Sequence, residues 1–104
     1  MTTRGESQRP DNGAASIVAS TAVSYEWNQP RREMFVTNIS TSGCKLLVKF
    51  NASHPASPTN WDVEVLPGDL CPGPETMHVA SVSIYNAGAS AMVLGTGFVA
   101  AGWA

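Results

Sequence analysis

"KLLVKFNAS", residues 45–53, is the stretch that decides the fold. Its side chains change character with a period of two, and successive side chains of a β-strand point to opposite faces of the sheet. Asparagine and serine, which favour turns, follow directly. The stretch therefore predicts a half-buried strand with Leu46, Val48 and Phe50 on its inner face and Lys45, Leu47 and Lys49 on its outer face.

Five further runs are rich in β-branched and aromatic residues and are separated by turn signals. They are residues 16–27, 32–40, 61–66, 76–86 and 90–103. The segments 28–30, 51–60 and 67–74 carry Pro, Gly, Asn and Ser and are expected to be turns or loops. Short strands with turn signals at intervals of about 8 to 12 residues, and no helical period, predict an all-β fold, an antiparallel β-sandwich or jelly roll.

The chain of 104 residues has room for one domain with one modest core. Its first 15 residues are polar and show neither a helical nor a strand period. We therefore expect an extended polar arm over residues 1–15 and a single β-sandwich over residues 16–104 that folds without the arm.

Charge is scarce in this chain. The formal net charge is -2, which gives no broad attraction to nucleic acid or to anionic membranes. Charged residues make up 13% of the chain, against about 25% in a typical soluble domain. We therefore expect much of the surface to be covered by a protein partner, and no nucleic-acid partner.

The redox state expected for the two cysteines depends on the compartment in which the chain is made. Residues 1–16 lack the apolar segment of a secretory signal, so we expect synthesis in a cytoplasm. Cys44 and Cys71 are then predicted to be free thiols in or near the core. The run 91–104 is too short and too rich in glycine to span a bilayer, and we expect no membrane partner.

No pattern of catalytic or metal-binding residues stands out. His54 and His78 have no ligand spacing around them, and Asp62 and Glu64 alternate on one strand face as solvating acids do. No serine lies in a G-x-S-x-G turn, and residues 95–100 match a dinucleotide motif without the helix that it needs. We predict no catalytic site, no metal and no cofactor. A small hydrolase would need a buried carboxyl or histidine in a cleft.

The segment "MFVTNISTSGCKLLVKFNAS" with the later "WDVEVLPGD" and "VASVSIYNAGAS" resembles a pattern in small structural proteins of tailed-phage virions. The pattern covers roughly residues 33–90. The resemblance implies a non-enzymatic capsid decoration, or cement, protein on the outer surface of the head, made in the host cytoplasm. Its implied partners are the major capsid protein and copies of itself, as a homotrimer or homodimer.

Two sets of residues are candidates for these contacts. No charged residue follows Glu75, so we expect residues 76–104, which include Ser83 and Trp103, to lie in the core and in a subunit contact. Arg4 and Arg9 are candidate anchors of the arm on a neighbouring subunit, because a guanidinium can hold a carboxylate with two hydrogen bonds.

A rival interpretation is a carbohydrate- or receptor-binding module of a phage tail or fibre. Trp27, Trp61 and Trp103 would then form an exposed platform for stacking sugars. The exposure of the tryptophans separates this interpretation from the capsid one, in which they pack in the core or in contacts.

Overall fold

The computed structural model describes residues 9–41, 43–51, 53–74 and 78–103. This part of the chain is all-β and has nine strands. They are β1 (Ser16–Ile17), β2 (Ala22–Arg31), β3 (Glu33–Asn38), β4 (Leu46–Phe50), β5 (Val63–Val65), β6 (Leu70–Pro72), β7 (Val79–Asn86), β8 (Met92–Val93) and β9 (Phe98–Trp103).

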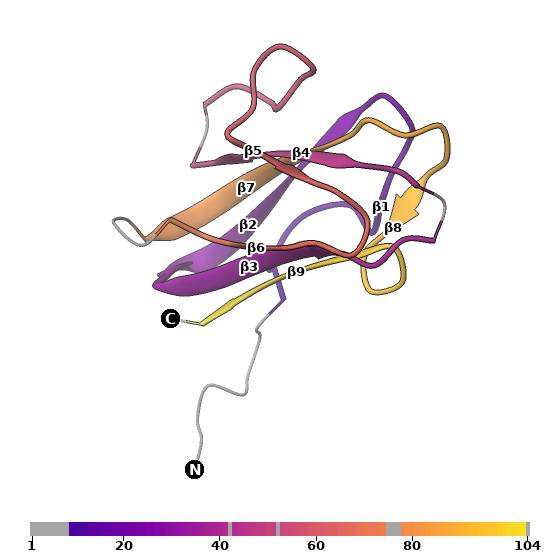
Figure 1. Ribbon diagram of the computed structural model, residues 1–104. Helices are drawn as coiled ribbons and strands as arrows, with labels where there is room; N and C mark the ends of the chain where they lie inside the picture. The colour runs from indigo at the N-terminus through magenta and orange to yellow at the C-terminus, as the bar shows by residue number, and fades with distance from the viewer. Residues whose placement is uncertain (1–8, 42, 52, 75–77, 104) are drawn as a thin grey trace.

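The strands form a sandwich of two antiparallel sheets (Figure 1). One sheet has the strand order β2-β7-β4-β5 and the other has the order β6-β3-β9, while β1 and β8 pair as a short ribbon at one end. The core lies between the sheets, where the rings of Tyr25 and Phe98 meet edge to face at 5.8 Å. The predicted all-β sandwich is confirmed.

Strand β4, which carries the decisive stretch, lies inside its sheet between β7 and β5. Leu46 and Val48 are fully buried in the core, as the period of two predicts. Leu47 points to the outer face and is nevertheless buried, which differs from the expectation. Ala56, from the loop between β4 and β5, is itself buried and bonds to the outer face, so we attribute the burial of Leu47 to that loop.

Three other segments differ from the expected strands. The run 16–27 contains a turn before β2, with Ser20 at a φ of 61°. Residues 28–30, expected to be a turn, belong to β2, where Pro30 is tolerated because β2 is an edge strand. Strand β6 lies within residues 67–74, which were expected to hold turns alone.

Two buried asparagines hold the strand ends. Asn86 donates its side-chain amide to the carbonyls of Ile17 and Ser90, at 2.9 and 2.7 Å, and accepts from the backbone N–H of Gly88. Asn38 repeats the arrangement at the end of β3, where it donates to the carbonyls of Cys44 and Val65. Each buried amide satisfies backbone groups of the segments that meet at the strand end.

Part of the expected arm belongs to the sandwich. Asn12 forms an antiparallel bridge with Glu26 of β2, and the hydroxyl of Tyr25 donates to the carbonyl of Ala14 at 2.7 Å. Ala15 accepts from the N–H of Leu94. Residues 12, 14 and 15 are therefore hydrogen-bonded to the sandwich, because polar backbone groups can pair with β2 and Leu94 even where few apolar side chains are available.

Candidate functional site

The two outer faces of the sandwich differ in charge. On the β2-β7-β4-β5 sheet, Lys45 and Glu64 form an ion pair at 2.9 Å, and Lys49 and Asp62 lie 3.9 Å apart. The carboxylate of Asp62 also accepts the N–H of Phe50. These acids hold lysines and backbone at the surface, so they do not form the converging pair that acid-base catalysis requires.

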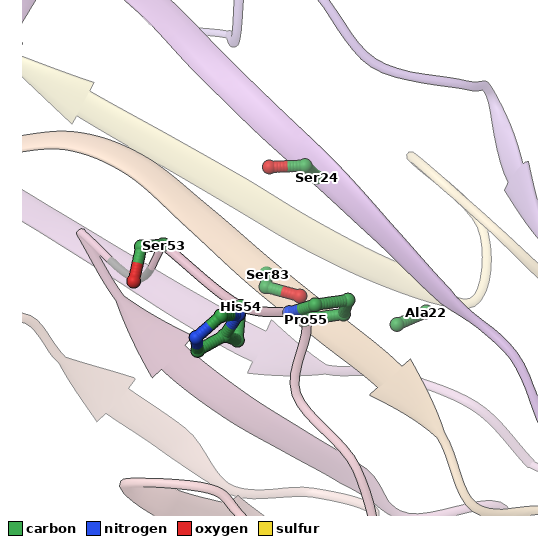
Figure 2. Close-up of a pocket in the computed structure, with 6 residues that line it drawn as sticks. All are labelled: Ala22, Ser24, Ser53, His54, Pro55 and Ser83. Carbon is green, nitrogen blue, oxygen red and sulfur yellow. The ribbon is translucent and has the colours of Figure 1, made fainter.

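The loop between β4 and β5 lies over this charged face and leaves a hollow of about 280 Å³ beneath its first residues (Figure 2). The hollow is lined by Ala22, Ser24, Ser53, His54, Pro55 and Ser83. Ser83 accepts the N–H of Ala56 at 2.9 Å and is buried. The loop is thus anchored to β7 through this hydroxyl, and His54 is exposed at its edge.

The outer face of the β6-β3-β9 sheet is mostly uncharged, with Glu33 at the start of β3. Phe35 lies between Pro72 and Ala101, and Thr37 lies between Leu70 and Val99. Alternation along β3, with Met34, Val36 and Asn38 buried, places these six residues on the outer side. We call Phe35, Thr37, Leu70, Pro72, Val99 and Ala101 the apolar face.

The apolar face is uneven across its strands. Leu70 of the edge strand β6 is 59% exposed. Ala101 of β9 is only 6% exposed, and Val99 is half-buried. At one end of the face, Arg32, Glu33, Phe35 and neighbouring residues of β3 and the segment 72–74 line an open hollow of about 360 Å³. The face is therefore exposed along β6, largely buried along β9, and bordered at one end by Arg32 and Glu33.

A second surface, whose own residues carry no charge, lies at the end of the sandwich where β1 pairs with β8 (Figure 1), and the guanidinium of Arg9 lies beside it at Gly95. We call residues 14–21 and 87–97 the charge-free end, since they contain no Asp, Glu, Lys or Arg. Val18 is 62% exposed there and Val93 is exposed beside it. The side chain of Asn86 ties both segments together.

The predicted contact residues lie apart from one another. Arg4 lies outside the described residues, as does the side chain of Trp103, whose backbone pairs with Glu33. The guanidinium of Arg9 lies beside Gly95 of its own chain. Ser83 of β7 is covered by the loop between β4 and β5 of the same chain. A substitution at Ser83 would therefore report on folding and not on a subunit contact.

The tryptophans do not form one exposed platform. Trp27 is buried because it follows Tyr25 by two positions on the inner face of β2. Trp61 is 42% exposed at the end of the loop between β4 and β5. The proposed three-tryptophan platform is therefore wrong, and Trp61 is the described tryptophan that a ligand could reach.

Both cysteines are free thiols, as predicted. Cys44 is buried against Gly88, where the Cβ of any other residue at position 88 would clash with the sulfur atom. Cys71 is half-buried, and burial raises the pKa of its thiol. The thiolate, which is the reactive form, is disfavoured in that position.

Comparisons and side-chain clusters give no further assignment. Among the described residues, no group of three or more His, Cys, Asp or Glu side chains could hold a metal ion. In the same part of the chain, no helix is long and apolar enough to cross a membrane. No family model, curated protein or solved structure matches this chain.

Sequence reasoning missed the apolar face, although a signal was present. In residues 33–39, "EMFVTNI", only Glu33 is charged. The residues after it are apolar or uncharged on both faces of the expected strand. A strand with one solvated face alternates apolar and polar residues, so this run indicates a strand covered on both sides. The partner strands could not be identified until the register joined β3 to β6 and β9.

Proposed function

We propose that this chain is a non-enzymatic structural protein that decorates the capsid of a tailed phage and clamps neighbouring major capsid subunits. The observation that carries the proposal is the presence of two separate surfaces with few charged residues, the apolar face and the charge-free end. A protein that works as a free monomer rarely leaves such surfaces exposed to water, whereas in an assembly a partner covers each of them. The resemblance of residues 33–90 to virion proteins supplies the kind of assembly.

The charge-free end is the surface that we assign to the capsid. Its exposed residues are mostly Ala, Ser and Val, which lose little side-chain entropy when a partner covers them. The Asn86 hydrogen bonds fix its backbone in advance. A preorganised surface of this kind loses less free energy on association than a flexible one does.

The rival proposal is a carbohydrate- or receptor-binding module of a tail or fibre, and the exposure of Trp61 favours it. A single aromatic ring can stack on one sugar, and the hydroxyls of Ser24 and Ser53 lie in the hollow under the same loop. This proposal places the functional surface on the outer face of the β2-β7-β4-β5 sheet. The apolar face belongs to the other sheet.

Co-sedimentation with phage heads prepared without this chain separates the two proposals. We expect the purified protein to sediment with heads, and the double variant Val18→Lys/Val93→Lys to lose at least tenfold in affinity. Trp61→Ala is the matched control and should bind like the parent. The capsid proposal fails if the double variant binds normally, or if Trp61→Ala alone abolishes binding.

A further inference from the structure

We propose that Asn12 is a spontaneous deamidation site, where the side-chain amide reacts with the backbone of Gly13 and then with water, and that this reaction releases residues 9–13 from the edge of β2. We call residues 9–13 the edge segment. The reaction is a property of the chain itself and does not depend on the capsid proposal.

The sequence distinguishes Asn12 from the other asparagines. Asparagine is thermolabile because the backbone nitrogen of the next residue can attack its side-chain carbonyl carbon. Gly13 has no Cβ to hinder that approach. The other five asparagines are each followed by a residue with a Cβ, namely Gln29, Ile39, Ala52, Trp61 and Ala87.

The structure leaves both reacting groups accessible. Asn12 and Gly13 are exposed. Within the described residues, neither the side-chain amide of Asn12 nor the N–H of Gly13 has a hydrogen-bond partner. The amides of Asn38 and Asn86 differ, because each is buried, donates to two carbonyls and accepts a backbone N–H. Those bonds hold the two buried amides in place, whereas the amide of Asn12 can turn toward Gly13.

The reaction consumes water and needs no other reactant. The backbone nitrogen of Gly13 bonds to the side-chain carbonyl carbon of Asn12, the amide C–N bond breaks, and ammonia leaves with the proton that the Gly13 nitrogen gives up. Water then breaks one of the two C–N bonds of the cyclic imide. Breakage at the side-chain carbon gives aspartate at position 12, and breakage at the main-chain carbon gives isoaspartate, whose main chain is longer by one carbon atom.

The bridge between Asn12 and Glu26 controls the rate of this reaction. The N–H of Asn12 donates to the carbonyl of Glu26 at 3.1 Å, and the N–H of Glu26 donates to the carbonyl of Asn12 at 3.0 Å. Ring closure turns the peptide group between Asn12 and Gly13, so the second bond has to open first. An isolated bridge on an edge strand opens at a small cost in free energy, and we expect the folded chain to react through such openings.

Either product weakens the same bridge. Residues directly opposite each other in an antiparallel pair project to the same side, where like charges are unfavourable. Aspartate at position 12 would face Glu26 and follow Asp11, whose carboxylate accepts the N–H of Asn28. The longer main chain of isoaspartate would not let both bonds to Glu26 form. The edge segment is then released, and β2 presents an unpaired edge that can accept another strand.

Peptide mass spectrometry of the full chain after incubation at mildly alkaline pH measures the reaction. We expect position 12 to convert to aspartate and isoaspartate at least tenfold faster than Asn60. Asn60 is the matched internal control, because it is also exposed and also forms an isolated bridge, with Ser57, but precedes Trp61. Gly13 is left unchanged, since a Cβ there would clash with the ring of Tyr25.

Three variants test the release of the edge segment. Asn12→Asp should lower the melting temperature, and Glu26→Gln in the same chain should recover part of the loss, because it removes the repulsion between the two carboxylates. Asn12→Gln should melt like the parent and resist conversion, because its longer side chain closes a less favourable ring. The incubated parent should melt as low as Asn12→Asp or lower.

Three results would overturn the inference. They are equal conversion of Asn12 and Asn60, conversion of Asn12 that leaves the melting temperature unchanged, and a conversion rate that does not rise when urea unfolds the chain and opens the bridge to Glu26.

Discussion

Replacement of Asn86 by alanine tests how the sandwich holds its charge-free end. The side chain is fully buried and serves three backbone groups, the carbonyls of Ile17 and Ser90 and the N–H of Gly88. A buried polar group that loses its partner costs about 1–3 kcal/mol. We use the lower value for each group because water can enter the space that the amide leaves. The expected loss is therefore about 3 kcal/mol in the free energy of unfolding.

A loss of this size is large for the chain. Domains of this length have total stabilities of about 5–15 kcal/mol, and 1 kcal/mol corresponds to a melting temperature shift of about 4–8 °C. Urea unfolding followed by tryptophan fluorescence, to which the buried Trp27 contributes, should show the change in midpoint with little change in slope.

Asn51 provides the control for this prediction. Its side chain also makes three hydrogen bonds to backbone groups, those of His78, Ala80 and Ser81, but it is exposed. Its φ is 50°, so Asn51→Gly avoids the strain that another residue would add. Water can replace these bonds, and we expect a loss below about 1.5 kcal/mol. The reasoning is refuted if Asn86→Ala is no more destabilising than Asn51→Gly.

Three other predictions concern pH, thiols and the arm. Burial raises the pKa of Tyr25 to about 12, so the folded state keeps this proton above pH 10 and stability falls between about pH 10 and 12, by at most about 1.4 kcal/mol per pH unit. Tyr25→Phe should reduce that fall in urea unfolding at pH 9 and 11, and an unchanged fall would contradict the assignment. Thiol titration should find two reactive cysteines in the denatured protein and, in the folded protein, faster labelling of Cys71 than of the buried Cys44; equal rates would argue against the burial. Deletion of residues 2–8 should leave thermal unfolding nearly unchanged. Deletion of residues 2–14 should lower the melting temperature, because Asp11, Asn12 and Ala14 bond to β2. Equal melting temperatures for the two deletions would mean that residues 9–14 add nothing to the stability of the sandwich.

The fold could be predicted from the sequence where the period of two is strong. Leu46 and Val48 alternate with lysines, and their burial follows from that pattern alone. The burial of Leu47 could not be predicted, because it depends on the covering loop between β4 and β5. The same loop covers Ser83, although strand parity places its side chain on the outer face of β7.

The candidate surfaces were predictable in part. The absence of charge after Glu75 indicated that β9 and its neighbours would be covered, and this remains a prediction. The composition of the surfaces depends on pairing between distant segments. Leu70 joins Thr37 and Val99 only through the register of three strands, and Val18 joins Val93 only through the β1-β8 ribbon.

Cryo-electron microscopy of the phage particle to which we assign this chain is the most direct test of its proposed role. The account predicts density for the sandwich on the outer surface of the head, between neighbouring major capsid subunits, with the charge-free end toward the capsid. Density at the tail tip or on a fibre, or heads without any density for the chain, would contradict it.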